Sequence, residues 1–228
     1  AKGGKCGEDA CVAIPNGEKL LLAVADGVGG WRSKGVDPSI FSNQLIDNLA
    51  DLFTSSTADN NKDSTLIEKV KTAFWRMADR SKRQIIGSST VAAAVVDRRQ
   101  NCMETVNIGD SGILLIRDDQ VVWQTHPKQT GFNAPLQLSL QMDGSAIDVT
   151  PRADLCNVEL CKGDVIVVGS DGLFDNVFQE EIVGMVKTIH DGNRSEQHMA
   201  DDLVSLAYRN SLQSDLTTPW SVEAERAG

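Results

Sequence analysis

The chain has 228 residues, of which 41% are hydrophobic and 24% charged, and its formal net charge at pH 7 is −10. That hydrophobic fraction suffices for the packed core of one large domain or two small ones. The negative net charge argues against a nucleic-acid partner, whose binding requires a basic surface on the protein. No apolar run approaches the roughly 20 residues of a membrane-spanning helix, so we expect no membrane span.

The five cysteines do not form a recognisable pattern. Their odd number, in a chain of this length, argues against a disulfide scaffold and favours a reducing compartment. The opening residues, Ala1-Lys2-Gly3-Gly4, show neither a signal-peptide nor a transit-peptide pattern. The absence of such a pattern says little about location, so the expectation of an intracellular, soluble protein rests on the cysteines and on the lack of a membrane span.

The first elements are predicted from turn signals and periodicity. Residues 10–14 and 19–25 are predicted strands, joined at the turn Pro15-Asn16-Gly17. Two amphipathic helices are predicted next, one beginning with Asp37 as its N-cap and one over residues 64–84.

The second half of the chain changes to a strand pattern. Short links predict an antiparallel meander of four strands, at 90–96, 103–108, 113–116 and 121–123. Residues 126–164 are rich in proline and glycine and are predicted to be an irregular, flap-like excursion. The last elements expected are a buried strand and two helices, at 165–169, 179–190 and 195–210.

This order of elements is strands, two helices, strands, two helices. Two stacked antiparallel sheets flanked by helices would bury all of their apolar faces. We therefore predict an α+β fold, an α-β-β-α sandwich, forming a single domain over residues 1–228.

Four short segments place acidic residues beside glycines. They are Gly7-Glu8-Asp9, Ala25-Asp26-Gly27-Val28-Gly29-Gly30, Gly109-Asp110-Ser111-Gly112 and Ser170-Asp171-Gly172-Leu173-Phe174-Asp175-Asn176. A carboxylate at the end of a buried strand is costly unless something pairs with it. Hard divalent cations take carboxylate and carbonyl oxygens, so the set predicts a metal site. Each Asp-Gly pair can alternatively be a simple turn.

Together, these segments resemble the metal-dependent Ser/Thr protein phosphatases of the phosphatase 2C family, and they occur in the family's order. Three further segments resemble a branch of that family known mainly from mitochondria: Gly29-Gly30-Trp31-Arg32, Gly35-Val36-Asp37-Pro38 and Phe132-Asn133 with Gln137-Leu138. The resemblance implies the α-β-β-α sandwich, a mitochondrial location and phosphoprotein substrates.

The resemblance also implies a role for each matching residue. Asp26 would bridge two Mn²⁺ or Mg²⁺ ions, and Glu8 with the backbone carbonyl of Gly27 would complete the protein ligands of one ion. Asp171 would hold the other ion, and Asp9 would hydrogen-bond to metal-bound waters.

A third, weaker metal is implied by two further acidic residues. Asp110 and Asp175, together with Asp171, match the positions that hold it in some members. Two metals that share a water lower its pKa, and the resulting hydroxide would attack a phosphoserine or phosphothreonine in line, without a phosphoenzyme.

Three departures from the family pattern affect this reading. Val28 stands where many members have a histidine that acts as general acid, and Gly4 stands where an arginine grips the substrate phosphate. Lys5 and Arg32 are the candidates to replace that arginine. The family's last segment, Gly-Gly-Lys-x-Asp-Asp-x-Thr, has no match, so we expect the final metal-ligand strand to be lacking.

Two alternative functions stay open at this point. The chain can be a catalytically impaired binding or regulatory module that keeps the phosphatase fold, or a phosphatase of small metabolites.

Overall fold

The computed structural model describes residues 5–55, 64–79, 85–190 and 195–228, and for Lys5, Cys6, Ile189 and His190 it describes the backbone only. Gly4 and the predicted helix end at 80–84 lie outside these residues. The described residues form two compact units. Unit 1 comprises the chain up to Ser111 and His126–Leu160, and unit 2 comprises Gly112–Thr125 and Cys161–Gly228.

Unit 1 is built on a six-stranded antiparallel sheet. In spatial order its strands are β1 (Lys5–Cys6), β2 (Asp9–Asn16), β3 (Lys19–Ala25), β5 (Val91–Asp97), β6 (Cys102–Ile108) and β13 (Asp154–Glu159). Strands β2 and β3 form the predicted hairpin. In β3 the side chains of Leu21, Ala23 and Ala25 are buried, while the residues between them are only partly covered. This alternation is the period of two expected of a strand with one core-facing side.

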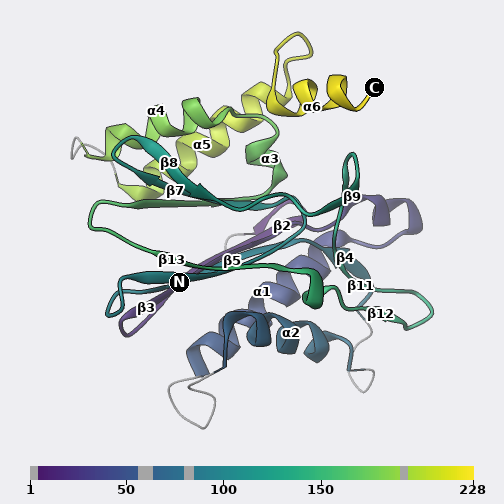
Figure 1. Cartoon of the computed structure of the whole chain (residues 1–228). Coiled ribbons are helices and arrows are strands. Elements are labelled where there is room, and N and C mark those ends of the chain that lie inside the picture. The colour runs from purple at the N-terminus through teal and green to yellow at the C-terminus, as the bar shows by residue number, and fades with distance from the viewer. Residues whose placement is uncertain (1–4, 56–63, 80–84, 191–194) are drawn as a thin grey trace. The chain divides into compact units, whose positions relative to one another are not determined.

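Two helices cover one face of this sheet (Figure 1), α1 (Pro38–Ser55) and α2 (Leu66–Met77). Asp37 accepts a hydrogen bond from the Ser39 amide at 3.0 Å, as expected of the predicted N-cap. Thr65 and Glu68 form a capping box at the start of α2. The helices meet through buried aromatic rings, with the centroids of Phe41 and Phe74 6.4 Å apart.

The excursion predicted over residues 126–164 is not irregular, and that prediction was wrong. Within it, β13 pairs with β6 along six residues, from Asp154↔Asn107 to Glu159↔Cys102. The strand was missed because it lies at a sheet edge and contains few apolar residues. The remaining elements are β9 (Gln129–Gly131), β10 (Ala134–Pro135), β11 (Leu138–Leu140), β12 (Ala146–Ile147) and the 3₁₀ helix η2 (Thr150–Arg152). Strand β11 also pairs with β4 (Gly87–Ser89).

Unit 2 contains a three-stranded antiparallel sheet in the order β14 (Val165–Gly169), β7 (Gly112–Arg117) and β8 (Gln120–Gln124). The predicted meander was therefore wrong between its second and third strands, since β6 and β7 belong to different sheets. The helices are α3 (Asp171–Phe174), α4 (Gln179–His190), α5 (Glu196–Ser211) and α6 (Pro219–Ala227). The sequence predicted only α4 and α5 among them.

The core of unit 2 lies between this sheet and its helices. Leu114 and Ile116 of β7 pack with Ile182 and Val186 of α4 and with Leu203 of α5. Within the described parts of both units, no helix combines the length and the apolar character needed to span a bilayer.

An ion pair joins the end of β7 to the loop before β14. Arg117 Nε and a terminal guanidinium nitrogen donate to the two carboxylate oxygens of Asp164, at 2.7 and 2.8 Å. The Cys161 amide adds a third hydrogen bond at 2.8 Å, and the Asp164 side chain is only 5% exposed. The hydrogen bond from Arg117 is the main reason that the pKa of Asp164 is lowered.

We expect Asp164→Asn to lower the free energy of unfolding by about 2 kcal/mol, because charge-assisted hydrogen bonds to a shielded carboxylate are lost. A folded-state pKa below the unfolded value of about 3.9 means that the contribution is complete above that pH. It should decline as the pH falls through the folded pKa. Urea unfolding of both proteins between neutral and acidic pH measures this.

The control is Lys187→Gln, which removes the exposed ion pair between Lys187 and Asp119 in the same unit. We expect it to change stability by less than about 1 kcal/mol. A gap between wild type and Asp164→Asn that stays the same at low pH would contradict the assignment.

The turn after β3 is packed too tightly for any residue but glycine. A Cβ atom on Gly27 would lie 2.6 Å from the carbonyl oxygen of Glu8 and 2.7 Å from that of Pro38. Gly27 also forms an isolated β-bridge with Ser89. Four backbone segments of unit 1 therefore meet at this position.

Gly27→Ala is expected to lower the free energy of unfolding by about 1–3 kcal/mol, because backbone atoms rather than flexible side chains would have to move. Gly30→Ala is the matched control, since a Cβ atom there meets no atom within 4 Å. It should stay within about 0.5 kcal/mol of wild type. Thermal unfolding in EDTA compares the two, and equal losses would contradict the packing argument.

Candidate functional site

Two predicted acidic residues lie at the same end of the β2–β3 hairpin. Strand β2 begins at Asp9, and the pair Ala10↔Ala25 is the last in its ladder with β3. Asp9 directly precedes Ala10 in β2, and Asp26 directly follows Ala25, the last residue of β3. The hairpin register therefore brings together residues that are far apart in the sequence.

Asp26 is held by backbone hydrogen bonds on both sides. Its amide donates to Thr90 Oγ1 at 3.2 Å, and its carbonyl oxygen accepts from the Thr90 amide at 3.0 Å. Thr90 Oγ1 also lies 2.7 Å from Ser111 Oγ, and both side chains are buried. This chain of contacts links Asp26 to Ser111, which belongs to another of the predicted acidic segments, within unit 1.

Glu8 lies against the glycine-rich segment that follows Asp26. A Cβ atom on Gly29 would be 2.9 Å from Glu8 Oε2, which shows how closely the carboxylate approaches the backbone there. The carbonyl oxygen of Glu8 accepts a hydrogen bond from Ser42 Oγ of α1 at 2.5 Å. Glu8 is thus positioned through both its backbone and its side chain.

Arg32 forms an ion pair and hydrogen bond with Glu8, between Nε and Oε1. The Glu8 side chain is 26% exposed, whereas the Arg32 side chain is 68% exposed. The hydrogen bond to Glu8 is the main reason that the pKa of Arg32 is raised. A predicted phosphate-binding residue is therefore in direct contact with a predicted metal ligand.

The 3₁₀ helix η1 (Gly29–Lys34) that carries Arg32 is anchored by a tryptophan. Trp31 is buried and donates from Nε1 to Ser88 Oγ at 2.7 Å. Lys34 Nζ lies 4.6 Å from the centre of the Trp31 ring, a cation–π contact. Sequence reasoning used Trp31 only as part of a motif and missed this structural role.

The other residues predicted in unit 1 are less closely connected to Glu8. Asp110 Oδ2 accepts a hydrogen bond from Gln129 Nε2 at 3.3 Å. Lys5 pairs with Ala10 through the β1–β2 ladder, and its side chain is outside the described part of the chain. Val28 is partly buried, and its amide donates to the Ser88 carbonyl oxygen at 3.0 Å.

Asp171 and Asp175 lie in unit 2, at the two ends of the short helix α3. Asp171 is its first residue and follows β14, as the sequence predicted for a carboxylate after a buried strand. The Asp175 amide donates to the Asp171 carbonyl oxygen at 2.7 Å, and the Asp175 carbonyl oxygen accepts from the Trp220 amide at 3.1 Å. Helix α6 thus contacts the predicted segment, which the sequence did not indicate.

The donor atoms that these segments of unit 1 carry are oxygens. They comprise the carboxylates of Glu8, Asp9 and Asp26 and the backbone carbonyl of Gly27, which are ligand types that Mg²⁺ and Mn²⁺ accept. Across the described ranges, no three carboxylate, imidazole or thiol side chains are grouped closely enough to hold a metal ion.

Several residues that support these donors were not predicted. Ser42, Ser88, Thr90 and Ser111 provide the hydrogen bonds that hold the segments around Glu8 and Asp26. The only feature of the sequence that could have indicated these supporting residues is the polar run Ser88-Ser89-Thr90 directly before an apolar strand.

Comparison with known proteins bears on this arrangement. The family model described as protein phosphatase 2C matches residues 1–207. A zebrafish (Danio rerio) protein phosphatase PTC7 homolog is 33% identical over 226 residues, covering 96% of this chain and 75% of the relative. Probable protein phosphatase 2C 26 of Arabidopsis thaliana is 36% identical over 224 residues, covering 98% and 69%.

Solved structures show the same fold. The X-ray structure of the photosystem II phosphatase PBCP is similar with a TM-score of 0.82 and 32% identity, covering 97% of this chain and 80% of that one. The catalytic domain of the serine/threonine protein phosphatase PstP, solved with two manganese ions, has a TM-score of 0.66. It is 22% identical, covers 92% and 90%, and supports the fold alone.

The family model, the relatives and the position of the acidic segments at strand ends all agree with the α+β fold of antiparallel sheets and flanking helices. The chain belongs to the protein phosphatase 2C family.

Proposed function

We propose that this protein is a Mn²⁺- or Mg²⁺-dependent protein serine/threonine phosphatase. The observation that supports the proposal is the approach of the backbone segments that carry Glu8, Asp9, Asp26 and Gly27 at one end of the β2–β3 hairpin, although among the described residues their carboxylates are not grouped as a formed metal cluster. These are the residues to which the family pattern assigns metal binding. Their oxygen donors suit a hard divalent cation, so the residues present fit the implied metal.

The proposed ligand roles follow the family pattern. By that pattern, Asp26, Glu8 and the Gly27 carbonyl would be the ligands contributed by unit 1, and Asp171 would be a ligand contributed by unit 2. Asp9 orients water by accepting its hydrogen bonds. When bound, two such ions supply Lewis acidity and a hydroxide nucleophile near neutral pH.

A weaker third ion is part of the proposal as well. By the positions that some family members use, Asp110, Asp171 and Asp175 would be its ligands.

Arg32 is proposed to bind the substrate phosphate. Its guanidinium is mostly exposed and is held beside Glu8 by the ion pair. A planar guanidinium can donate two hydrogen bonds to phosphate, which a lysine ammonium cannot do with the same geometry. Lys5 is the second candidate for this role.

Val28 has no proton to give to the leaving oxygen of serine or threonine. Protonation of the leaving oxygen is therefore assigned to a water molecule and not to Val28. The resemblance to PTC7 homologues supports a mitochondrial location and phosphoprotein substrates as part of the same proposal.

Asp26→Asn should reduce Mn²⁺-dependent hydrolysis of a phosphothreonine peptide by about 100-fold or more, because an amide cannot replace a bridging carboxylate. Asp47→Asn, an exposed change on α1, is the matched control and should keep wild-type activity. EDTA should abolish wild-type activity.

Activity in Asp26→Asn equal to that of wild type would refute the assigned site. No activity in the wild type with Mn²⁺ or Mg²⁺ would favour the alternative of a phosphatase-fold binding module. Preference for small phosphate esters over phosphopeptides would favour a metabolite phosphatase.

Arg32→Ala should raise the KM for the phosphopeptide about tenfold, with a smaller change in kcat, because one charged contact with the phosphate is lost. Arg32→Lys should recover part of the loss, since the charge returns without the fork. Arg98→Ala, an exposed arginine in a turn of unit 1, serves as control. An unchanged KM in Arg32→Ala would move the phosphate-binding role to Lys5.

A further inference from the structure

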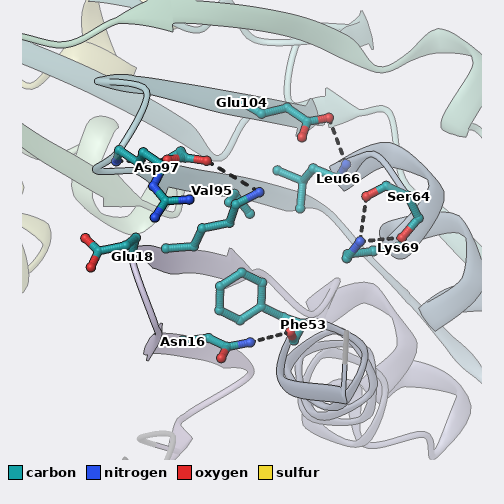
Figure 2. A pocket seen from close by; sticks show the side chains of 11 residues that line it. Asn16, Glu18, Phe53, Ser64, Leu66, Lys69, Val95, Asp97 and Glu104 are labelled. Atoms are coloured by element: carbon teal, nitrogen blue, oxygen red, sulfur yellow. Dashed lines mark hydrogen bonds and ion pairs between the residues drawn. The ribbon is translucent and has the colours of Figure 1, made fainter. Parts of the chain in front are cut away.

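A cavity of about 320 Å³ lies in unit 1 at the opposite end of β3 from Asp26. Lys19 lines it and begins the strand, whereas Asp26 follows the strand's last residue, Ala25. At roughly 3.3 Å per residue, β3 separates the two places by about 20 Å. Figure 2 shows the cavity between the end of α1, the start of α2 and the strand ends. It is therefore distinct from the proposed metal centre.

Two of the carboxylates that line the cavity already have partners (Figure 2). Asp97 accepts hydrogen bonds from the amides of Arg99 and Gln100, at 2.9 and 3.0 Å, and lies 3.5 Å from Lys19 Nζ. Glu104 accepts a hydrogen bond from the Leu66 amide at the start of α2, at 2.8 Å. These contacts reduce the capacity of either group to attract a cationic ligand.

The Lys69 ammonium is a buried charge beside the cavity that Glu104 and Glu68 compensate only from beyond ion-pair distance in the described part of the chain. The residue is only 8% exposed, and its Nζ donates to the carbonyl oxygen of Ser64 at 2.5 Å and to the Ser64 hydroxyl. In the described part of the chain no carboxylate forms an ion pair with it, and burial lowers its pKa. A buried cation that contacts only neutral oxygens retains much of its desolvation cost.

Arg99 lines the same cavity and supplies a second cation. It is exposed on the turn after β5, and among the described residues its guanidinium forms no ion pair. Its planar fork matches the oxygens of a phosphate or carboxylate. Phe53, Leu66 and Val95 add apolar wall beside these charges.

We propose that this cavity binds a small organic oxyanion, with a phosphate or carboxylate head group contacted by Lys69 and Arg99. The apolar wall of Phe53, Leu66 and Val95 accommodates the body of the ligand. The negative charge of the ligand would neutralise the Lys69 ammonium, which the neutral oxygens of Ser64 cannot do. This charge compensation is the physical reason for binding. The proposal does not depend on the phosphatase activity.

The test is calorimetric titration of the whole chain in EDTA, so that the proposed metal centre does not take up phosphate. The probes are inorganic phosphate, phenyl phosphate and benzoate. We expect one-site binding of phenyl phosphate or benzoate, weakened about tenfold or more in Arg99→Gln and in Lys69→Met. Arg98→Gln and Lys71→Met, both at neighbouring exposed positions, should bind as wild type does.

Tighter binding of phenyl phosphate identifies a phosphate head group, tighter binding of benzoate identifies a carboxylate, and either result supports the proposal. Failure of every probe to bind, or equal affinity in wild type and Arg99→Gln, would overturn it. Arg99 is exposed in a turn, so this variant tests the idea even where Lys69→Met does not fold.

Discussion

The close approach of backbone segments around Gly27 is the constraint on which the rest of unit 1 depends. The carbonyl groups of Glu8 and Pro38 leave no room for a side chain there. As a consequence, the start of β2, the end of β3 and the start of α1 are held at one place. The acidic residues on these segments come together because the backbone does, and their charges then have to be balanced.

The balance of charge is achieved differently at the two ends of β3. At the acidic end, Arg32 reaches over from η1 to Glu8, and hydroxyl groups hold the backbone of Asp26 through Thr90. At the other end, Lys69 is buried against neutral oxygens, while the nearby carboxylates are engaged by amides. The first end carries excess negative charge. The second combines three carboxylates with three cations, of which Lys69 and Arg99 form no ion pair among the described residues. This asymmetry underlies the two different ligand classes proposed for them.

The sequence predicted those elements whose signals are local. The β2–β3 hairpin followed from two apolar segments and the Pro15-Asn16-Gly17 turn signal, although Pro15 and Asn16 belong to β2 and the turn lies at Gly17 and Glu18; α1 followed from its N-cap and apolar spacing. The acidic segments were predicted because a carboxylate after an apolar run is chemically unusual.

Strand β13 was not predictable in this way, since its place in the sheet depends on pairing with β6, which the chain reaches only after a long excursion. The break between β6 and β7 was hidden for the same reason, because link length does not reveal a change of sheet. The contact between Arg32 and Glu8 likewise depends on how η1 is anchored by Trp31.

Strand β3 is paired along both edges, with seven residue pairs to β2 and six to β5. Deletion of a single residue inside it would turn every following side chain to the opposite face of the sheet, so a change in its length would disrupt both ladders. The turn at Gly17 and Glu18 has no such restriction, because both residues are exposed and insertions there extend into solvent. Variation in the length of that turn would therefore reshape the rim of the cavity near Lys19 while leaving the acidic end of the strand as it is. Related proteins can in this way diverge in what they bind at one end of the strand and keep the same chemistry at the other.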